Sequence, residues 1–311
     1  MKILVVGAGG LGGYFGGLLA KTGEDVWFVA RGRHLEALRK HGLTVHSVHG
    51  DFAVQVNATD RPEDARGAEL ILLCVKTYDT EAAMAGLAPA AGKGSIILPL
   101  QNGVESADKV GGMFGYDRVL GGLAYLESFV AAPGVIEQRS QIRRIEFGEL
   151  NGAETDRARE VREVLTRADI DCRLRPDIAR ALWEKLAWIA AGSGMTALAR
   201  SPIGEVLAFP PTREMFVSAA GEVGTVAEAL GIRLDPGIAD RTLKFALSLS
   251  PTLKTSMQRD VERGGRLEVD ALNGAVVRIG ARLSVHTPVN GFVYDVLKLE
   301  DEKNRLRRAA S

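Results

Sequence analysis

Short apolar runs alternate with mixed, helix-like segments through the first hundred residues of the chain. The four runs cover residues 3–6, 25–30, 70–75 and 95–100. Such runs, bounded by glycine or polar residues, are typical of parallel strands buried on both faces. Helices are expected between the runs, near residues 11–19, 34–40 and 80–87. This alternation predicts a doubly wound, mainly parallel sheet with right-handed helical crossovers, that is, a Rossmann domain.

The pattern changes after residue 120. Residues 121–148 read as short strands with a Pro133-Gly134 turn, which predicts antiparallel pairing. A helix at 155–168 and a strand at 171–174 follow. Beyond Pro176 the strand signal fades, and Asp177 is a good N-cap for a helix reaching residue 191. Later helices are predicted at 211–230, 236–249, 256–263, 269–282 and 290–299.

The expected fold class is therefore α/β, with two domains. Residues 1–176 form the Rossmann domain, and residues 177–311 form an all-α domain. The basic tail KNRLRRAAS, residues 303–311, is interpreted as a frayed and solvated helix end. The helical domain offers apolar faces for a homodimer, although the sequence equally allows a monomer.

Composition narrows the class of protein without naming a function. Hydrophobic residues make up 46% of the 311 residues and charged residues 25%, as in ordinary soluble domains. The 39 basic residues balance the 39 acidic ones, which gives no reason to expect a nucleic-acid or membrane partner. Cys74 and Cys172 lie in strand-like runs and fit a reducing cytoplasm. The five histidines lack metal-ligand spacing, and His41, His46 and His49 are expected to be solvated.

The first strand runs directly into a glycine-rich loop. Residues 7–12, GAGGLG, match the G-x-G-x-x-G pattern between a strand and a helix. The first glycine would permit a tight turn, the second a close approach to a pyrophosphate, and the third close helix–strand packing. The alternative is an ordinary glycine-rich turn. The predicted cofactor loop comprises Gly7, Ala8, Gly9, Gly10, Leu11 and Gly12.

Arg31 follows the second predicted strand, 19 residues after Gly12. NAD sites place an acidic residue there to bond the ribose hydroxyls. A guanidinium can instead bind the 2′-phosphate of NADP, which a carboxylate would repel. The sequence therefore predicts NADP(H) as the cofactor, with a solvated surface arginine as the alternative.

Several motifs follow one another along nearly the whole chain. They are GAGGLG, Arg31, CVK at 74–76, QNG at 101–103, LWEKL at 182–186, TSM at 255–257 with Asp260, and EVDALNG at 268–274. In these motifs and their order the chain resembles the ketopantoate reductase (2-dehydropantoate 2-reductase) family, and the lysine helix combined with the last segment is the most specific part of this resemblance.

The resemblance implies a Rossmann domain followed by a helical domain of the 6-phosphogluconate-dehydrogenase-like type, with an active site in the cleft between them. It implies hydride transfer from NADPH to the keto carbon of a 2-oxo acid, as in pantothenate biosynthesis. Lys185 would be the general acid, and Glu268 would orient or tune it. Lys76 and Asn102 would lie on the nicotinamide side and contact cofactor and substrate, while Ser256 would bind the substrate carboxylate.

The residues themselves agree with a catalytic lysine. Hydride delivery to a ketone builds negative charge on oxygen, which a nearby ammonium stabilises and protonates. Lys185 shares a helical face with Ala181, Ile189 and Ser193. Burial would lower its pKa and a carboxylate such as Glu268 would raise it, and the sequence leaves open which effect is larger. The alternative is a lysine that snorkels from an amphipathic helix.

Simpler structural interpretations exist for the other candidates. Lys76 could be a surface lysine at a strand end, and Asn102 could belong to a plain Asn-Gly turn. Ser256 could be a helix N-cap, and Glu268 a surface carboxylate. Asp270 and Asn273 are interpreted as structural and stay outside the predicted site.

The lysine helix departs from the family pattern where substrate binds. The family carries asparagines four and eight residues after the lysine and an Asn-Pro pair, whereas this chain has Ile189, Ser193 and Gly194. Ile189 makes no side-chain hydrogen bond and would add an apolar wall near the keto acid, which changes what fits. Ile189 and Ser193 are therefore predicted to contact substrate.

Three functions remain open from the sequence. The first is NADPH-dependent reduction of 2-dehydropantoate to pantoate. The second is reduction of a different, more apolar 2-oxo acid by the same fold, which Ile189 favours. The third is a non-catalytic NADP-binding sensor, against which Lys185 and Glu268 count.

Overall fold

The computed structural model describes residues 1–309, which fall into two compact units. The N-terminal unit contains Met1–Gln101 and Ser106–Ile178. The helical unit contains Asn102–Glu105 and the chain from Ala179 on. The main crossing at Ile178 lies close to the boundary expected at Pro176. The inclusion of Asn102–Glu105 in the helical unit was not foreseen.

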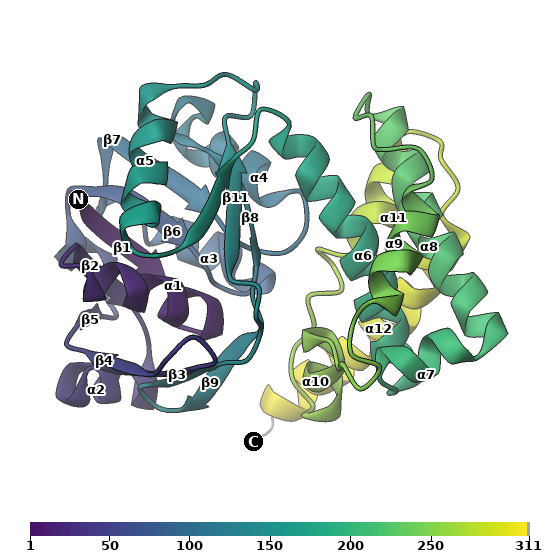
Figure 1. Ribbon diagram of the computed structural model, residues 1–311, viewed down its shortest axis with the longest axis horizontal. Helices are drawn as coiled ribbons and strands as arrows, with labels where there is room; N and C mark the ends of the chain where they lie inside the picture. Colours follow the sequence, from purple (N-terminus) through teal and green to yellow (C-terminus); the bar gives the residue numbers. More distant parts are fainter. Residues whose placement is uncertain (310–311) are drawn as a thin grey trace. The chain divides into compact units, whose positions relative to one another are not determined.

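A five-stranded parallel sheet forms the centre of the N-terminal unit (Figure 1). Its strand order is β5-β2-β1-β6-β7, so the chain reverses direction of winding between β1 and β6. Ligands of such sheets bind at the carboxyl ends of the strands beside this reversal. The strands are β1 (Lys2–Val6), β2 (Asp25–Val29), β5 (Asn57–Thr59), β6 (Ala68–Leu73) and β7 (Ala91–Pro99).

Both faces of the central strands β1 and β6 are buried, which explains their apolar runs. Ile3 and Val5 of β1 belong to one core cluster, and Leu4 and Val6 belong to another. The first cluster includes side chains of α1 (Gly10–Lys21), α2 (Gly32–His41) and α5 (Asp156–Arg167); the second includes those of α3 (Thr80–Ala85) and α4 (Ser106–Phe114). The predicted doubly wound sheet is confirmed, although α4 was not foreseen.

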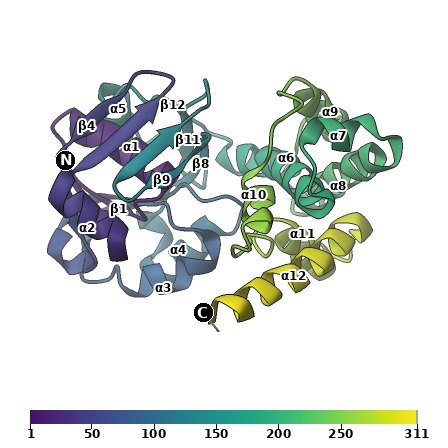
Figure 2. The same cartoon turned by 90° about the horizontal axis from the view of Figure 1, so that it is seen from below.

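Two smaller sheets complete the N-terminal unit, and Figure 2 shows β12, β11 and β8 side by side. The predicted antiparallel pairing is right for β8 with β11 and for β9 with β10. It is incomplete, because β10 also pairs in parallel with β3, and β11 with β12. The strands are β3 (Leu43–Ser47), β4 (Phe52–Val54), β8 (Gly121–Tyr125), β9 (Ser128–Ala132), β10 (Val135–Gln138), β11 (Arg144–Gly148) and β12 (Asp171–Leu174).

The sequence did not predict β3, β4 or β5, because β3 and β5 are rich in polar residues and β4 has only three residues. β3 alternates buried Leu43 and Val45 with less buried neighbours, as a strand covered on one face does. His46 and His49 are exposed, as expected, and His46 pairs with Asp51 at 2.8 Å. Three short 3-10 helices cover Pro62–Ala65, Thr77–Asp79 and Tyr116–Arg118.

The helical unit packs around one apolar core, so the predicted all-α region is confirmed. Its first helix continues to Ala199 instead of ending near residue 191. Gly192 and Gly194 lie inside it because side chains there would meet the Trp188 ring and Val293. The helices are α6 (Ile178–Ala199), α7 (Ile203–Ala208), α8 (Pro210–Ala229), α9 (Ile238–Leu247), α10 (Ser256–Glu262), α11 (Asn273–Arg282) and α12 (Pro288–Ala309).

The basic tail is more ordered than expected. Helix α12 runs through Ala309, and Asn304 within the tail is fully buried and donates to the Gly265 carbonyl at 2.9 Å. A buried amide with this bond holds the helix end in place, so the frayed-end interpretation is wrong for this part. Residues 310 and 311 lie outside the described residues. Of the helices described, none combines the length and apolar character needed to cross a membrane.

Candidate active site

The glycines of the loop after β1 have different surroundings. Gly7 has a φ of +101°, and a Cβ there would lie 2.8 Å from the Val75 amide nitrogen. A Cβ on Gly12 would lie 2.1 Å from the Gly7 carbonyl oxygen, so α1 packs closely on the loop. A Cβ on Gly9 would meet nothing within 4 Å. The loop is therefore tight where it turns and open at Gly9, where the first amides of α1 are available to an anion.

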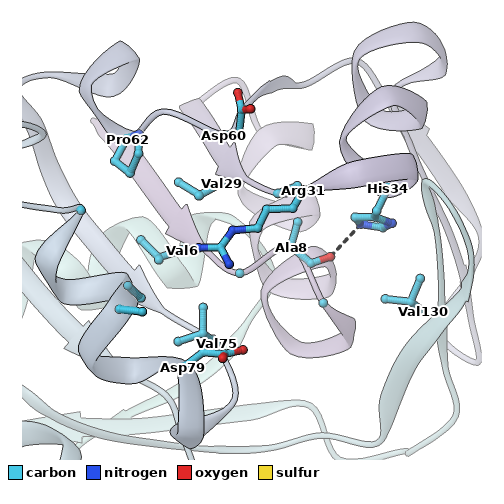
Figure 3. Close-up of a pocket in the computed structure, with 16 residues that line it drawn as sticks. Val6, Ala8, Val29, Arg31, His34, Asp60, Pro62, Val75, Asp79 and Val130 are labelled. Carbon is cyan, nitrogen blue, oxygen red and sulfur yellow. Dashed lines mark hydrogen bonds between the residues drawn. The ribbon is translucent and has the colours of Figure 1, made fainter. Parts of the chain in front are cut away.

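A pocket of about 450 Å³ opens beside this loop (Figure 3). Arg31 points into it and, within residues 1–309, forms no ion pair. The pocket does not include Gly10, Leu11, Gly12, Lys76 or Asn102 among its lining residues. It is lined by Val6, Gly7, Ala8, Gly9, Val29, Ala30, Arg31, His34, Asp60, Pro62, Val75, Asp79, Ala82, Ala83, Gly86 and Val130.

Three polar residues of this pocket have no role in the sequence analysis. Asp60 and Asp79 are exposed carboxylates, and Asp60 pairs with Arg39 at 3.4 Å. His34 is half-buried and contacts the loop through the Ala8 carbonyl oxygen at 2.8 Å. Recognising β5 would have placed Asp60 beside Arg31, because β5 and β2 are parallel neighbours. No sequence signal shows the partners of His34.

Lys76 follows β6 by three residues, since the strand ends at Leu73 and not at Val75. It is half-buried and precedes the 3-10 helix Thr77–Asp79. Val75, its neighbour, lines the pocket. Lys76 thus lies at the carboxyl edge of the sheet, next to the pocket.

Lys185 of α6 donates a hydrogen bond from Nζ to Oδ1 of Asn102 at 3.1 Å. Burial lowers the pKa of Lys185 to about 8, and the negative charge of Glu268 partly opposes this change. The question left open by the sequence is thereby answered, because burial is the larger effect. A lysine with this pKa is still mostly protonated at pH 7 but releases its proton more readily than an ordinary lysine.

Asn102 reaches Lys185 because residues 102–105 are built into the helical unit. Gly103 has a φ of +94°, and a Cβ there would lie 2.7 Å from the Ala271 carbonyl oxygen, so only glycine fits. Val104 packs on the core of the helical unit, and Glu105 pairs with Arg278 at 2.7 Å. The Asn-Gly turn is therefore real, and it also positions a side chain.

Glu268 is buried, with 6% of its surface exposed, so the surface-carboxylate interpretation is wrong. Asp270, two residues later, is bound by α12: Tyr294 donates to it at 2.9 Å and Lys298 at 2.7 Å. Asn273 is fully buried and donates to the Ala190 carbonyl and to Asn290. Asp270 and Asn273 thus hold helices together, as their structural interpretation predicts.

The remaining candidates are distributed differently. Ile189 and Ser193 follow Lys185 on α6 and are largely buried, with 9% and 6% exposed, and Ile189 joins the core of the helical unit. Ser256 is exposed at the first position of α10. Thr255 provides the N-cap by accepting from the Gln258 amide at 3.3 Å, so Ser256 is not the cap. Within residues 1–309, no three or more His, Cys, Asp or Glu side chains gather to hold a metal ion.

Two family models match the chain and together span most of it. The model described as "Ketopantoate reductase PanE/ApbA" matches residues 3–152. The model described as "Ketopantoate reductase PanE/ApbA C terminal" matches residues 177–301. The matches therefore include the glycine loop, Arg31, Lys185 and Glu268.

Relatives and solved structures agree with these models. An uncharacterised oxidoreductase, YkpB, of Bacillus subtilis is 34% identical over 304 residues, 97% of this chain and 100% of that protein. A 2-dehydropantoate 2-reductase of Mesorhizobium japonicum is 30% identical over 93% of this chain and 94% of its own length. The crystal structure of a 2-dehydropantoate 2-reductase from Geobacter metallireducens superposes with a TM-score of 0.91 at 33% identity, covering 96% of this chain and 99% of that one.

Proposed function

The chain belongs to the ketopantoate reductase family of oxidoreductases, and we propose that it reduces a 2-oxo acid to a 2-hydroxy acid with NADPH. The first candidate substrate is 2-dehydropantoate, on which relatives named 2-dehydropantoate 2-reductase act. The observation that carries the proposal is the partly buried Lys185, with its pKa lowered to about 8 and its Nζ bonded to Asn102.

The pocket of the N-terminal unit is the proposed cofactor site. The open side of Gly9 leaves room for a pyrophosphate against the first amides of α1. The guanidinium of Arg31, which forms no ion pair with the described residues, supports a 2′-phosphate and therefore NADP(H). When bound, the nicotinamide supplies the hydride.

The proposed role of Lys185 is to protonate the oxygen of the reacting carbonyl. Hydride addition to the keto carbon breaks the C=O π bond, and the oxygen takes a proton from the Nζ ammonium. Asn102 accepts a hydrogen bond from the same ammonium and fixes its direction. Glu268 keeps the pKa of Lys185 from falling further, so that the donor stays charged at neutral pH.

The proposal predicts a pH dependence of reduction. Lys185 must be protonated to donate, so kcat/KM is expected to be constant below pH 8 and to fall about tenfold per pH unit above it. Because the Glu268 carboxylate raises the pKa of Lys185, Glu268→Gln should move this fall to lower pH. Initial rates measured across pH test this, with Glu262→Gln on exposed α10 as the control. A fall at the same pH in Glu268→Gln contradicts the assignment.

Ile189 favours a second candidate substrate, a more apolar 2-oxo acid. Its side chain follows Lys185 by one helical turn and brings no hydrogen-bonding group. We expect Ile189→Asn to raise kcat/KM for 2-dehydropantoate relative to an apolar 2-oxo acid by roughly 10-fold, because a missing polar partner is restored. Ile189→Leu should leave the ratio unchanged. The measurement is NADPH oxidation across a panel of 2-oxo acids.

The panel also separates the three candidate functions. Rapid turnover of 2-dehydropantoate supports the first, and turnover of another acid alone selects the second. Tight NADPH binding without turnover of any acid would indicate a non-catalytic sensor. The cytoplasmic location and the homodimer stay predictions; Cys74 and Cys172 are free thiols, as a reducing compartment would keep them.

A further inference from the structure

His34 connects two parts of the N-terminal unit that are far apart in the sequence. Its Nε2 lies 2.8 Å from the carbonyl oxygen of Ala8, 26 residues away in the glycine loop. Its Nδ1 lies 3.0 Å from the amide nitrogen of Gly134, 100 residues away in the turn between β9 and β10. Figure 3 shows the ring beside Ala8, at the side of the pocket that Val130 of β9 also lines.

These two partners fix the protonation state of the ring. A backbone amide can only donate, so Nδ1 accepts from Gly134 and carries no proton. A carbonyl oxygen can only accept, so Nε2 carries the proton and donates it to Ala8. The neutral ring satisfies both partners, whereas the imidazolium has no acceptor for Gly134. Burial lowers the pKa of His34, and the bond to Ala8 partly opposes this.

The β9–β10 hairpin is a wall of the cofactor pocket and also packs on the start of α1. A Cβ on Gly10 would lie 2.4 Å from the Ser128 carbonyl oxygen, and one on Gly13 would lie 2.8 Å from Ile136. The turn itself is held from its other side, because the Gly134 carbonyl accepts from the Thr44 amide at 2.9 Å. The hairpin therefore contacts both the start of α1 and, through the Gly134 amide, the ring that binds the glycine loop.

We propose that His34 is a positioning residue for the cofactor loop. It ties the Ala8 carbonyl to the β9–β10 turn, which holds the loop in one conformation before the dinucleotide binds. Preorganisation of this kind lowers the ordering cost of binding. This inference rests on the proposed function of the pocket, and His34 acts through the loop and not on the reacting atoms.

Two substitutions separate the two hydrogen bonds. Gln at position 34 can place an amide NH₂ near the Nε2 position and keep the bond to Ala8. Asn is shorter and can place its oxygen near Nδ1, keeping only the bond to Gly134. Each substitution breaks the connection between the loop and the turn on at least one side, so we expect NADPH to bind roughly fivefold more weakly to His34→Ala, His34→Asn and His34→Gln alike. His46→Gln, on an exposed histidine of the same unit, is the control.

A pH titration gives a readout that a merely structural role would not move. As pH falls below the ordinary histidine pKa, the wild-type ring gains a proton and loses Gly134, so NADPH affinity should fall. The 2′-phosphate of the cofactor also titrates near pH 6, so the comparison is between wild type and His34→Gln, in which the phosphate contribution is shared. The charged groups lining the same pocket, Arg31, Asp60 and Asp79, are also present in both proteins.

The experiment is fluorescence titration of NADPH against each variant from pH 5.5 to 8.5, with the melting temperature and hydrogen exchange of residues 130–138 measured without cofactor. Weaker binding in all three folded variants, with an acid-dependent loss of affinity confined to proteins with His34, supports the inference. Unchanged affinity in His34→Ala, wild-type affinity in His34→Gln or His34→Asn, or the same acid-dependent loss in His34→Gln as in the wild type, overturns it. Absence of saturable NADPH binding by the wild type would instead overturn the proposed function.

Discussion

Lys185→Ala is expected to reduce kcat for 2-oxo acid reduction by roughly 10³-fold, the range typical of a lost general acid. The physical reason is that Lys185 is partly buried, that its Nζ donates a hydrogen bond to Asn102, and that its pKa is lowered to about 8. The dissociation constant of NADPH should stay within about twofold of the wild-type value, because the proposed cofactor pocket does not include Lys185. Stopped-flow measurement of NADPH oxidation, together with cofactor titration, gives both quantities.

Lys185→Arg separates the contribution of the positive charge to kcat from the contribution of proton transfer. Arginine keeps a positive charge near the developing alkoxide but holds its proton at all accessible pH values. We therefore expect partial activity without the alkaline fall of the wild type. Lys254→Ala, an exposed lysine of the helical unit, is the matched control. If Lys185→Ala keeps more than a tenth of the wild-type kcat, Lys185 is not the proton donor.

Arg31→Ala is expected to weaken NADPH binding by roughly 10–100-fold, since charge-assisted hydrogen bonds to a phosphate are worth about 1.5–3 kcal/mol. NADH lacks the 2′-phosphate, so its dissociation constant should change by no more than about twofold. The wild type should bind NADPH at least about tenfold more tightly than NADH, and the variant should lose this preference. Fluorescence titration with both nucleotides measures the four constants.

The neighbouring Arg33 supplies the control for Arg31. Arg33 lies on α2, two residues after Arg31; its side chain is exposed and does not line the pocket. Arg33→Ala should therefore keep the preference for NADPH, apart from a small effect of net charge at low salt. Equal dissociation constants for NADPH and NADH in the wild type would remove Arg31 from phosphate recognition.

Local patterns were sufficient to predict the central sheet. Strands such as β1 and β6 are buried on both faces, so their apolar runs are visible without any knowledge of their neighbours. The polar strand β5 is defined by its pairing with β2, which the sequence does not display. The length of α6 was missed for a similar reason. Its two glycines, Gly192 and Gly194, look like helix breakers in the sequence, but they are there because Trp188 and Val293 leave no room for side chains.

The candidate site divides in the same way. Arg31 and Lys185 could be proposed as candidates because Arg31 follows the second strand after the glycine loop and Lys185 lies in the LWEKL segment, and their roles stay predictions. The role of His34 could not be predicted from the sequence, because both of its hydrogen-bond partners come from distant parts of the chain. Ser256 shows the limit at a single residue, since either Thr255 or Ser256 could cap α10 and only the backbone geometry assigns the cap to Thr255.

Residues 102–105 belong to the helical unit although they lie within the N-terminal half of the chain, and this affects the design of chimeras between related enzymes. A chimera that joins the N-terminal unit of one enzyme to the helical unit of another at Ile178 would take Lys185 and Glu268 from the second enzyme and residue 102 from the first. A chimera made in this way would pair the incoming lysine with a foreign hydrogen-bond acceptor, and the incoming Arg278 with a foreign position 105. The proposed site of the helical unit is therefore encoded by two separate pieces of sequence, and a swap of this unit has to include residues 102–105.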